Sequence, residues 1–205
     1  ADAASLMADN GNYFRGGDMH YVDQNGDHRI DSKDRVALGS AAPDFFGGFY
    51  TQFKYKGFAL GAEFSYSKGN MAYNAVRNQL EGMNTLGNQS IAVLNRWSLD
   101  GQVTNMPRVQ HNDPYRSTSF SERWLEDASY LRMKSVTLSY SFDKTVLNFF
   151  RSGTLYVSGE NLLTATKYLG LDPEFSYSYG ETSQGLDYAK MVQPKSVKFG
   201  VNLKF

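Results

Sequence analysis

The last eleven residues of the chain alternate strictly between apolar and polar side chains. In KSVKFGVNLKF, every second residue from Val197 to Phe205 is apolar, and lysine, glycine or asparagine stands between them. Successive side chains of a β-strand point to opposite faces of its sheet, so the pattern predicts a strand with one apolar and one polar face. The segment is also as long as a strand that crosses a membrane at a tilt.

The same period of two recurs upstream and predicts an all-β fold. In FFGGFYTQFKY, Phe45, Phe49 and Phe53 share one register, and Lys56-Gly57 then predicts a tight hairpin turn. In YLRMKSVTLSYSF the apolar phase slips once near Ser135, which predicts a β-bulge. The strands are expected near residues 45–55, 58–67, 129–142, 153–163 and 195–205. The polar face of these strands, which would line the lumen of a barrel, is expected to include Glu63, Tyr156, Ser158 and Glu160.

Composition narrows the class of protein without deciding it. Lysine plus arginine and aspartate plus glutamate cancel at 21 each, so nothing in the charge balance points to nucleic acid. The chain has no cysteine, which excludes disulfides and thiolate metal sites. Aromatic residues make up 15% of it, a content that fits either a soluble domain or a transmembrane β-barrel.

The connections between the expected strands alternate between short and long. From the C-terminus backwards they span about thirty, about ten, about sixty and two residues. A structureless connection of sixty residues is unusual in a compact soluble domain. Outer-membrane barrels, in contrast, combine short periplasmic turns with long extracellular loops. The spacing therefore favours a barrel whose long loops all lie outside the cell.

Four motifs in order resemble one family over almost the whole chain, from Gly17 to Phe205. They are VDQNGDHRIDSKDRVALGSAAPDFFGGF, RWLEDASYLRMKSVTLSYSF, YVSGENLLTATKYLGLDPE and the alternating terminal strand. Together they resemble the C-terminal barrel portion of the SusC/RagA-type TonB-dependent outer-membrane transporters of Bacteroidetes. The resemblance implies the last five or so antiparallel strands of a 22-stranded transmembrane β-barrel, because five strands alone would leave an open sheet edge in lipid.

The resemblance also implies a function, a location and partners. It implies import of glycans or oligopeptides across the bacterial outer membrane, with a SusD-like surface lipoprotein over the extracellular mouth. It further implies energy from TonB-ExbB-ExbD through a plug domain that this chain does not contain, and contact with outer-membrane lipid. Residues 1–44 would form an extracellular loop, residues 45–205 the barrel part, and Phe205 the terminal signal for barrel assembly.

The stretch VDQNGDHRIDSKD matches the spacing of an EF-hand calcium loop. Alternate oxygen-bearing residues of such a loop wrap a hard cation. Two departures weaken the match: His28 stands where glycine makes the sharp turn, and an aspartate replaces the final bidentate glutamate. The alternative is an Asx-rich turn whose carboxylates cap its own backbone N–H groups. A structural Ca²⁺ would be held by Asp23, Asn25, Asp27, Arg29 through its carbonyl, Asp31 and Asp34.

Neither the histidines nor the adjacent carboxylates suggest catalysis. The three histidines are scattered, and no zinc-protease, Ser-His-Asp or P-loop motif can be assembled, so we predict no catalytic residue and a protein that is not an enzyme. The adjacent Glu126 and Asp127 point to opposite faces of an extended chain, which predicts a structural role. Aromatic residues of the long loops could instead stack on a substrate, and the candidates are Tyr73, Trp97, Trp124, Tyr168 and Tyr177.

Two other classes of protein share parts of the pattern. A passive porin has the same strand alternation but needs neither a plug nor a lipoprotein. A soluble, calcium-stabilised, carbohydrate-binding β-sandwich would pack its apolar strand faces against one another. The barrel hypotheses predict an apolar face open to lipid, and the sandwich predicts a covered one.

Overall fold

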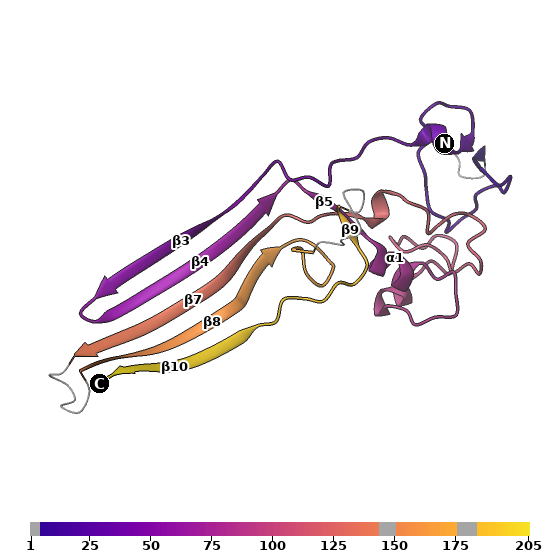
Figure 1. Ribbon diagram of the computed structural model, residues 1–205. Helices are drawn as coiled ribbons and strands as arrows, with labels where there is room; N and C mark the ends of the chain where they lie inside the picture. The colour runs from indigo at the N-terminus through magenta and orange to yellow at the C-terminus, as the bar shows by residue number, and fades with distance from the viewer. Residues whose placement is uncertain (1–4, 144–150, 176–183) are drawn as a thin grey trace. The chain divides into compact units, whose positions relative to one another are not determined.

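The alternating segments form one antiparallel sheet of five strands, in the order β10-β8-β7-β4-β3 (Figure 1). The computed structural model describes residues 5–143, 151–175 and 184–205. The all-β prediction is confirmed, and the observed strand ends lie within three residues of the expected ones. The strands are β3 (Phe45–Tyr55), β4 (Phe58–Lys68), β7 (Tyr130–Asp143), β8 (Ser152–Thr166) and β10 (Ser196–Lys204).

The strand registers give the sheet one apolar and one polar face. Phe49 pairs with Phe64 across β3 and β4, and Phe199 pairs with Val157 across β10 and β8. The apolar face is open: Phe53 is 70% exposed and Phe199 is 82% exposed. Rings on this face also pack against one another, as in the stacked pair Phe49 and Phe64, whose centroids are 4.8 Å apart. The polar face carries Glu63, Ser135, Thr137, Tyr156, Ser158, Glu160 and Lys198, among others.

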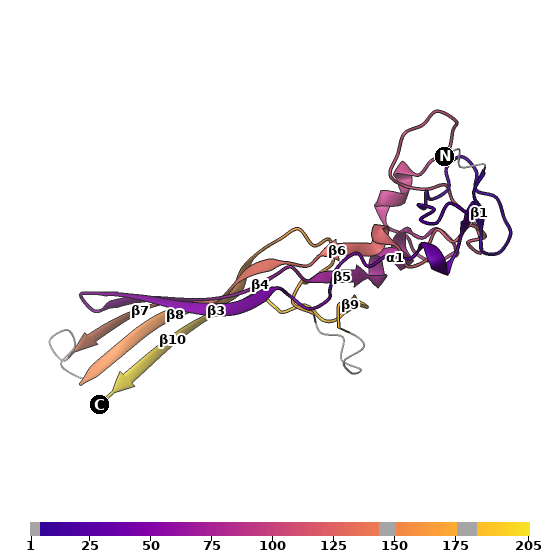
Figure 2. The ribbon, with the colours of Figure 1, turned by 90° about the horizontal axis from the view of Figure 1, so that it is seen from above.

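Figure 2 shows the five strands as a single twisted layer. The predicted hairpin joins β3 to β4: Lys56 and Gly57 have φ of 44° and 85°, as a type I′ turn requires at both positions. The predicted bulge is also present. Met133 and Ser135 pair with neighbouring partners on β4, so that Lys134 between them has no paired residue there.

A second compact unit is built from the long connections. We call it the loop unit; it comprises Ala1–Gly39, Tyr73–Glu126 and Leu186–Ala189, and the remaining segments form the sheet unit. The loop unit joins residues 1–39 to residues 73–126. The expected division at residue 44 placed these two segments in different parts of the chain. The elements of the loop unit, some shared with the sheet unit at their ends, are β1 (Met7–Ala8), β2 (Arg29–Ile30), η2 (Ser32–Asp34), β5 (Met71–Asn74), α1 (Ala75–Glu81), η3 (Ile91–Asn95), η4 (Glu122–Trp124), β6 (Leu125–Asp127) and β9 (Leu186–Asp187).

The loop unit has little regular structure and small apolar clusters. Leu6, Ala8 and Phe14 form one cluster, and Met83, Val93 and Met106 form another. Parallel pairing joins β1 to β2 and β5 to β9. Among the described residues, no helix has both the length and the apolar character to cross a membrane.

Candidate functional site

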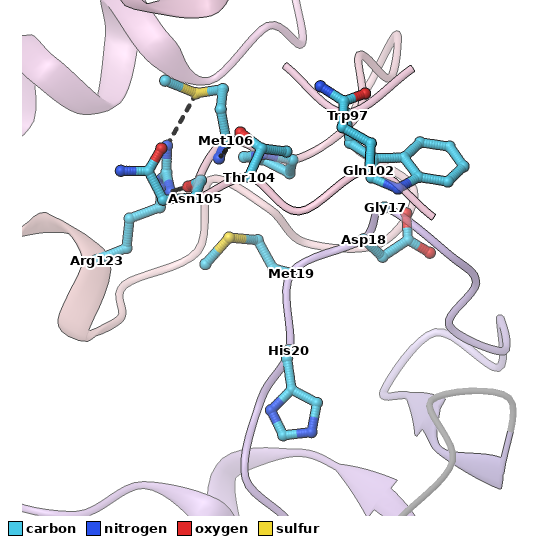
Figure 3. Close-up of a pocket in the computed structure, with 11 residues that line it drawn as sticks. Gly17, Asp18, Met19, His20, Trp97, Gln102, Thr104, Asn105, Met106 and Arg123 are labelled. Carbon is cyan, nitrogen blue, oxygen red and sulfur yellow. Dashed lines mark hydrogen bonds between the residues drawn. The ribbon is translucent and has the colours of Figure 1, made fainter. Parts of the chain in front are cut away.

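The loop unit contains a cavity of about 400 Å³. Figure 3 shows Trp97 and Gln102 at one end of it and Arg123 and Asn105 at the other, while the His20 ring points away from this group. The cavity wall is formed by Gly17, Asp18, Met19, His20, Trp97, Gln102, Thr104, Asn105, Met106, Pro107 and Arg123.

The Trp97 end of the cavity depends on a glycine. A Cβ atom added to Gly17 would lie 2.4 Å from the Trp97 indole, so only glycine allows the ring to lie against the backbone there. Two backbone hydrogen bonds hold these segments together: Trp97 N–H donates to the Met106 carbonyl at 3.0 Å, and Arg108 N–H donates to the Gly17 carbonyl at 2.7 Å. The sequence predicted Trp97 as a ligand-contact residue, and the structure places it in the wall of a cavity.

Asp18 lies in the cavity wall, and each of its carboxylate oxygens accepts two hydrogen bonds. Its side chain is 1% exposed, and both carboxylate oxygens accept hydrogen bonds from the Arg108 guanidinium. The backbone N–H of Arg15 and the side-chain amide of Gln110 also donate to it. The hydrogen bonds that Arg108 donates to Asp18 raise the pKa of Arg108. Asp18 is therefore a structural carboxylate that ties residues 15–18 to residues 108–110.

At the other end of the cavity, the Arg123 guanidinium pairs with the Glu81 carboxylate at 3.7 Å. The Arg123 side chain is 10% exposed. One terminal nitrogen donates to the carbonyl of Asn105, and the other donates to the Met106 sulfur at 2.9 Å. The Nε atom is buried and has no hydrogen-bond partner. Burial, with Arg77 nearby, lowers the pKa of Arg123.

Behind Arg123, a buried network of charges surrounds Trp124. The Arg77 and Arg123 guanidinium groups lie 5.6 and 4.9 Å from the centroid of the indole, which is 1% exposed. Arg77 also pairs with Glu81 at 3.1 Å and with Glu126 at 2.9 Å. Each charged side chain of this network has a partner of opposite charge. We therefore assign the network a structural role. The structural role expected for Glu126 agrees with this geometry.

In the predicted calcium loop, carboxylates and amides cap backbone N–H groups. Asp23 accepts from Gly26 and His28, and Asp34 accepts from Gln24 and Asp31. His28 has φ of 62°, the left-handed conformation expected where an EF-hand has glycine. Asp31 is the N-cap of η2 and forms a capping box with Asp34. Residual burial acts to raise the pKa of Asp23, but the surrounding N–H groups lower it overall.

These contacts are those of the self-capped turn. Within residues 5–143, 151–175 and 184–205, no group of three or more histidine, cysteine, aspartate or glutamate side chains is placed to hold a metal ion. The expected ligand set also includes an amide oxygen from Asn25 and the backbone carbonyl oxygen of Arg29, which are not among these four side-chain types. Calcium binding by this loop stays a prediction.

The other expected substrate aromatics lie in different surroundings. The Tyr73 ring stacks on Phe120, with centroids 4.6 Å apart and planes 8° from parallel. Burial raises the pKa of Tyr73. Trp124 and Tyr168 are 1% and 6% exposed, so neither ring has a free face to offer a ligand. Tyr177 lies outside the described residues.

The sheet unit contains an ionic clamp that the sequence analysis missed. On β7, Arg132 is 3% exposed and pairs with Asp172, forty residues further along the chain, and with Glu174 two residues after it. Lys134 Nζ lies 2.6 Å from the Glu174 carboxylate. Burial alone would raise the pKa of Asp172, but the Arg132 guanidinium and the N–H groups of Glu174 and Gln193 lower it overall. The clamp fastens the segment that follows β8 to β7.

The sequence of this chain is similar to those of TonB-dependent receptors. No protein-family model matches the sequence. TonB-dependent receptor P3 of Formosa agariphila is 32% identical over 197 residues, which are 93% of this chain and 19% of that receptor. TonB-dependent receptor SusC of Bacteroides thetaiotaomicron is 26% identical over 188 residues, or 90% of this chain and 17% of SusC.

The fold is also similar to that of a solved outer-membrane importer. The structure of the RagAB peptide importer in its open-open state superimposes with a TM-score of 0.72 and 28% sequence identity. The match covers 90% of this chain and 20% of the RagAB chain. This chain thus spans about a fifth of the length of the proteins it resembles, and it corresponds to a portion of their barrel.

Proposed function

Because this chain is a relative of the SusC/RagA-type TonB-dependent receptors, we propose that it supplies barrel strands and extracellular loops of an outer-membrane importer. The observation that carries the proposal is the division of the five-stranded sheet into an open apolar face and a polar face. An apolar face that is exposed along every strand suits contact with lipid, and the opposite face suits a polar lumen. A soluble sandwich would require the apolar face to be covered, whereas Phe53 and Phe199 are exposed.

The proposed substrates are glycans or oligopeptides. Support comes from the relatives, one of which is SusC, while another is named as a peptide importer. The proposed partner is a SusD-like surface lipoprotein that closes over the extracellular loops. Energy would come from TonB-ExbB-ExbD through a plug domain elsewhere in the polypeptide, and Phe205 would serve in barrel assembly.

Uptake measurements in living cells test this proposal. Cells that produce the full-length receptor are given radiolabelled oligosaccharides or oligopeptides, and the same measurement is made in cells that lack TonB and in cells that lack the receptor. We expect uptake to fall to background in both deletion strains. Uptake that requires the receptor but persists without TonB would contradict the proposal and would fit the passive porin instead.

A further inference from the structure

The Arg123 side chain has hydrogen-bonding capacity that the protein does not use. A guanidinium carries five N–H donors and no acceptor. Within the described part of the chain, Arg123 makes one hydrogen bond to a carbonyl and one to a thioether sulfur, which is a weak acceptor. Its Nε is buried without a partner, and the nearest carboxylate, that of Glu81, lies 3.7 Å from a terminal nitrogen. Buried donors of this kind normally have an acceptor.

Apart from the Glu81 carboxylate, which forms an ion pair with Arg123 at 3.7 Å, the neighbouring groups do not supply an acceptor. The Asp18 oxygens are taken up by Arg108, Gln110 and the Arg15 backbone. The side-chain oxygen of Gln102 accepts from Ser98, and the Thr104 hydroxyl donates to the Asn95 carbonyl. Arg123 nevertheless forms part of the cavity wall.

The wall between Arg123 and Trp97 carries apolar side chains beside polar ones. Met19 and Met106 contribute flexible thioether side chains, which adapt to the shape of a ligand. In Figure 3 the Met19 side chain lies between the Arg123 end and the Trp97 end of the cavity. The indole offers a flat apolar surface, while the Asn105 amide stands near the guanidinium.

We propose that this cavity binds a carboxylate-bearing ligand, with the carboxylate at the Arg123 guanidinium and the apolar part of the ligand between Met19, Met106 and Trp97. Carboxylates are the planar anions that a guanidinium binds best. The inference rests on the proposed function in one respect, namely that the ligand is a substrate at the extracellular loops. A carboxylate of this kind is found either on an oligopeptide or on an acidic sugar.

Binding of matched acid and neutral probes tests the proposal. The full-length receptor is purified in detergent, and affinities are measured by isothermal titration calorimetry. One pair of probes is N-acetyl-Leu-Gly and its C-terminal amide; the other is digalacturonic acid and its methyl ester. The acid form of one pair should bind about ten- to one-hundredfold more tightly than its neutral form, the factor that corresponds to a hydrogen bond with a charged group. Preference within the first pair indicates a peptide, and preference within the second an acidic sugar.

Substitutions in the cavity wall show whether Arg123 causes this preference. Arg123→Gln should abolish the preference for the acid form. Because Arg123 also packs on Trp124, this variant is paired with Asn105→Asp, which places a carboxylate beside the guanidinium and should occupy it from within. Val103→Asp is the matched control: it adds the same charge to a fully exposed side chain outside the cavity wall, and it should keep the preference. Heat-modifiable migration on a denaturing gel confirms that each barrel is folded.

Two results would overturn the inference: equal affinity of the wild-type receptor for acid and neutral forms of both pairs, or an acid preference that survives in Asn105→Asp. Either result can occur in a receptor whose uptake still depends on TonB, in which case the proposed function stands without this ligand site. Uptake that no longer depends on TonB, in contrast, would contradict the proposed function itself.

Discussion

An arginine placed on the apolar face of the sheet distinguishes a lipid-facing strand from a water-facing one. Phe199 lies near the middle of β10 (Ser196–Lys204), opposite Val157 on the apolar face, and is 82% exposed. If this face meets lipid, Phe199→Arg puts a charge near the bilayer midplane, where arginine costs about 2–4 kcal/mol. If the face meets water, an exposed substitution changes stability by no more than about 0.5 kcal/mol.

Two further arginine variants supply the controls. Leu203 is on the same face but next to the end of β10, where the cost of arginine falls to about 0–1 kcal/mol. Asn202 pairs with Thr154 on the polar face, so Asn202→Arg should have little effect. The expected order of destabilisation is therefore Phe199→Arg, then Leu203→Arg, then Asn202→Arg.

The free energy of unfolding of the full-length receptor in phospholipid vesicles is measured by guanidinium titration, with tryptophan fluorescence as the signal. The lipid account requires Phe199→Arg to lower that free energy by at least 2 kcal/mol relative to Asn202→Arg, as the cost at the bilayer midplane implies. If the two variants unfold at the same denaturant concentration, the assignment of this face to lipid is wrong.

Three other variants follow from the contacts. Asp172→Asn leaves the Arg132 charge buried with a weakened partner, so urea titration at pH 7 should show a loss of up to about 3–5 kcal/mol. Because the folded pKa of Asp172 is lowered from its ordinary value of 3.8, its contribution is fully present above that value and is lost as the pH falls through the folded pKa; the difference between variant and wild type should therefore shrink steadily as the pH falls below 3.8, and a constant difference would refute the pairing. Trp124→Ala should cost about 3–5 kcal/mol in the same titration because the ring is 1% exposed, and a loss no larger than that of Trp97→Ala would contradict its burial against two arginines. If the predicted calcium loop binds Ca²⁺, calorimetric titration will show a site that Asp23→Ala abolishes, whereas identical traces for both proteins would assign the loop to the self-capped turn alone.

The strands could be predicted from the sequence because their pattern is local. The side chain of every second residue faces the same way, so the order of residues in KSVKFGVNLKF already defines both faces of β10. The hairpin at Lys56-Gly57 and the bulge before Ser135 also leave local signals, namely a two-residue gap and a change of phase. Each of the four motifs that resemble the receptors includes part of a strand of the sheet, although the first begins in the loop unit at Val22.

The loop unit could not be predicted in this way. Arg77 meets Glu126 across 49 residues, and Arg108 meets Asp18 across 90, and no period in the sequence brings these residues together. Trp124 shows the limit clearly: an aromatic residue in a long polar loop suggests ligand contact, but the ring is buried and two arginines lie against it. Trp97 has the same sequence character and lies in the cavity wall. Only the tertiary contacts distinguish the two tryptophans.

The central claim is that this chain is part of a large outer-membrane importer, and the size and location of the native polypeptide test it most directly. Outer membranes are extracted with detergent, and the protein that carries this sequence is identified by denaturing gel and mass spectrometry. We predict a polypeptide several times larger than 23.0 kDa that requires detergent and co-purifies with a lipoprotein. A free protein of 23.0 kDa that stays in solution without detergent would contradict the account.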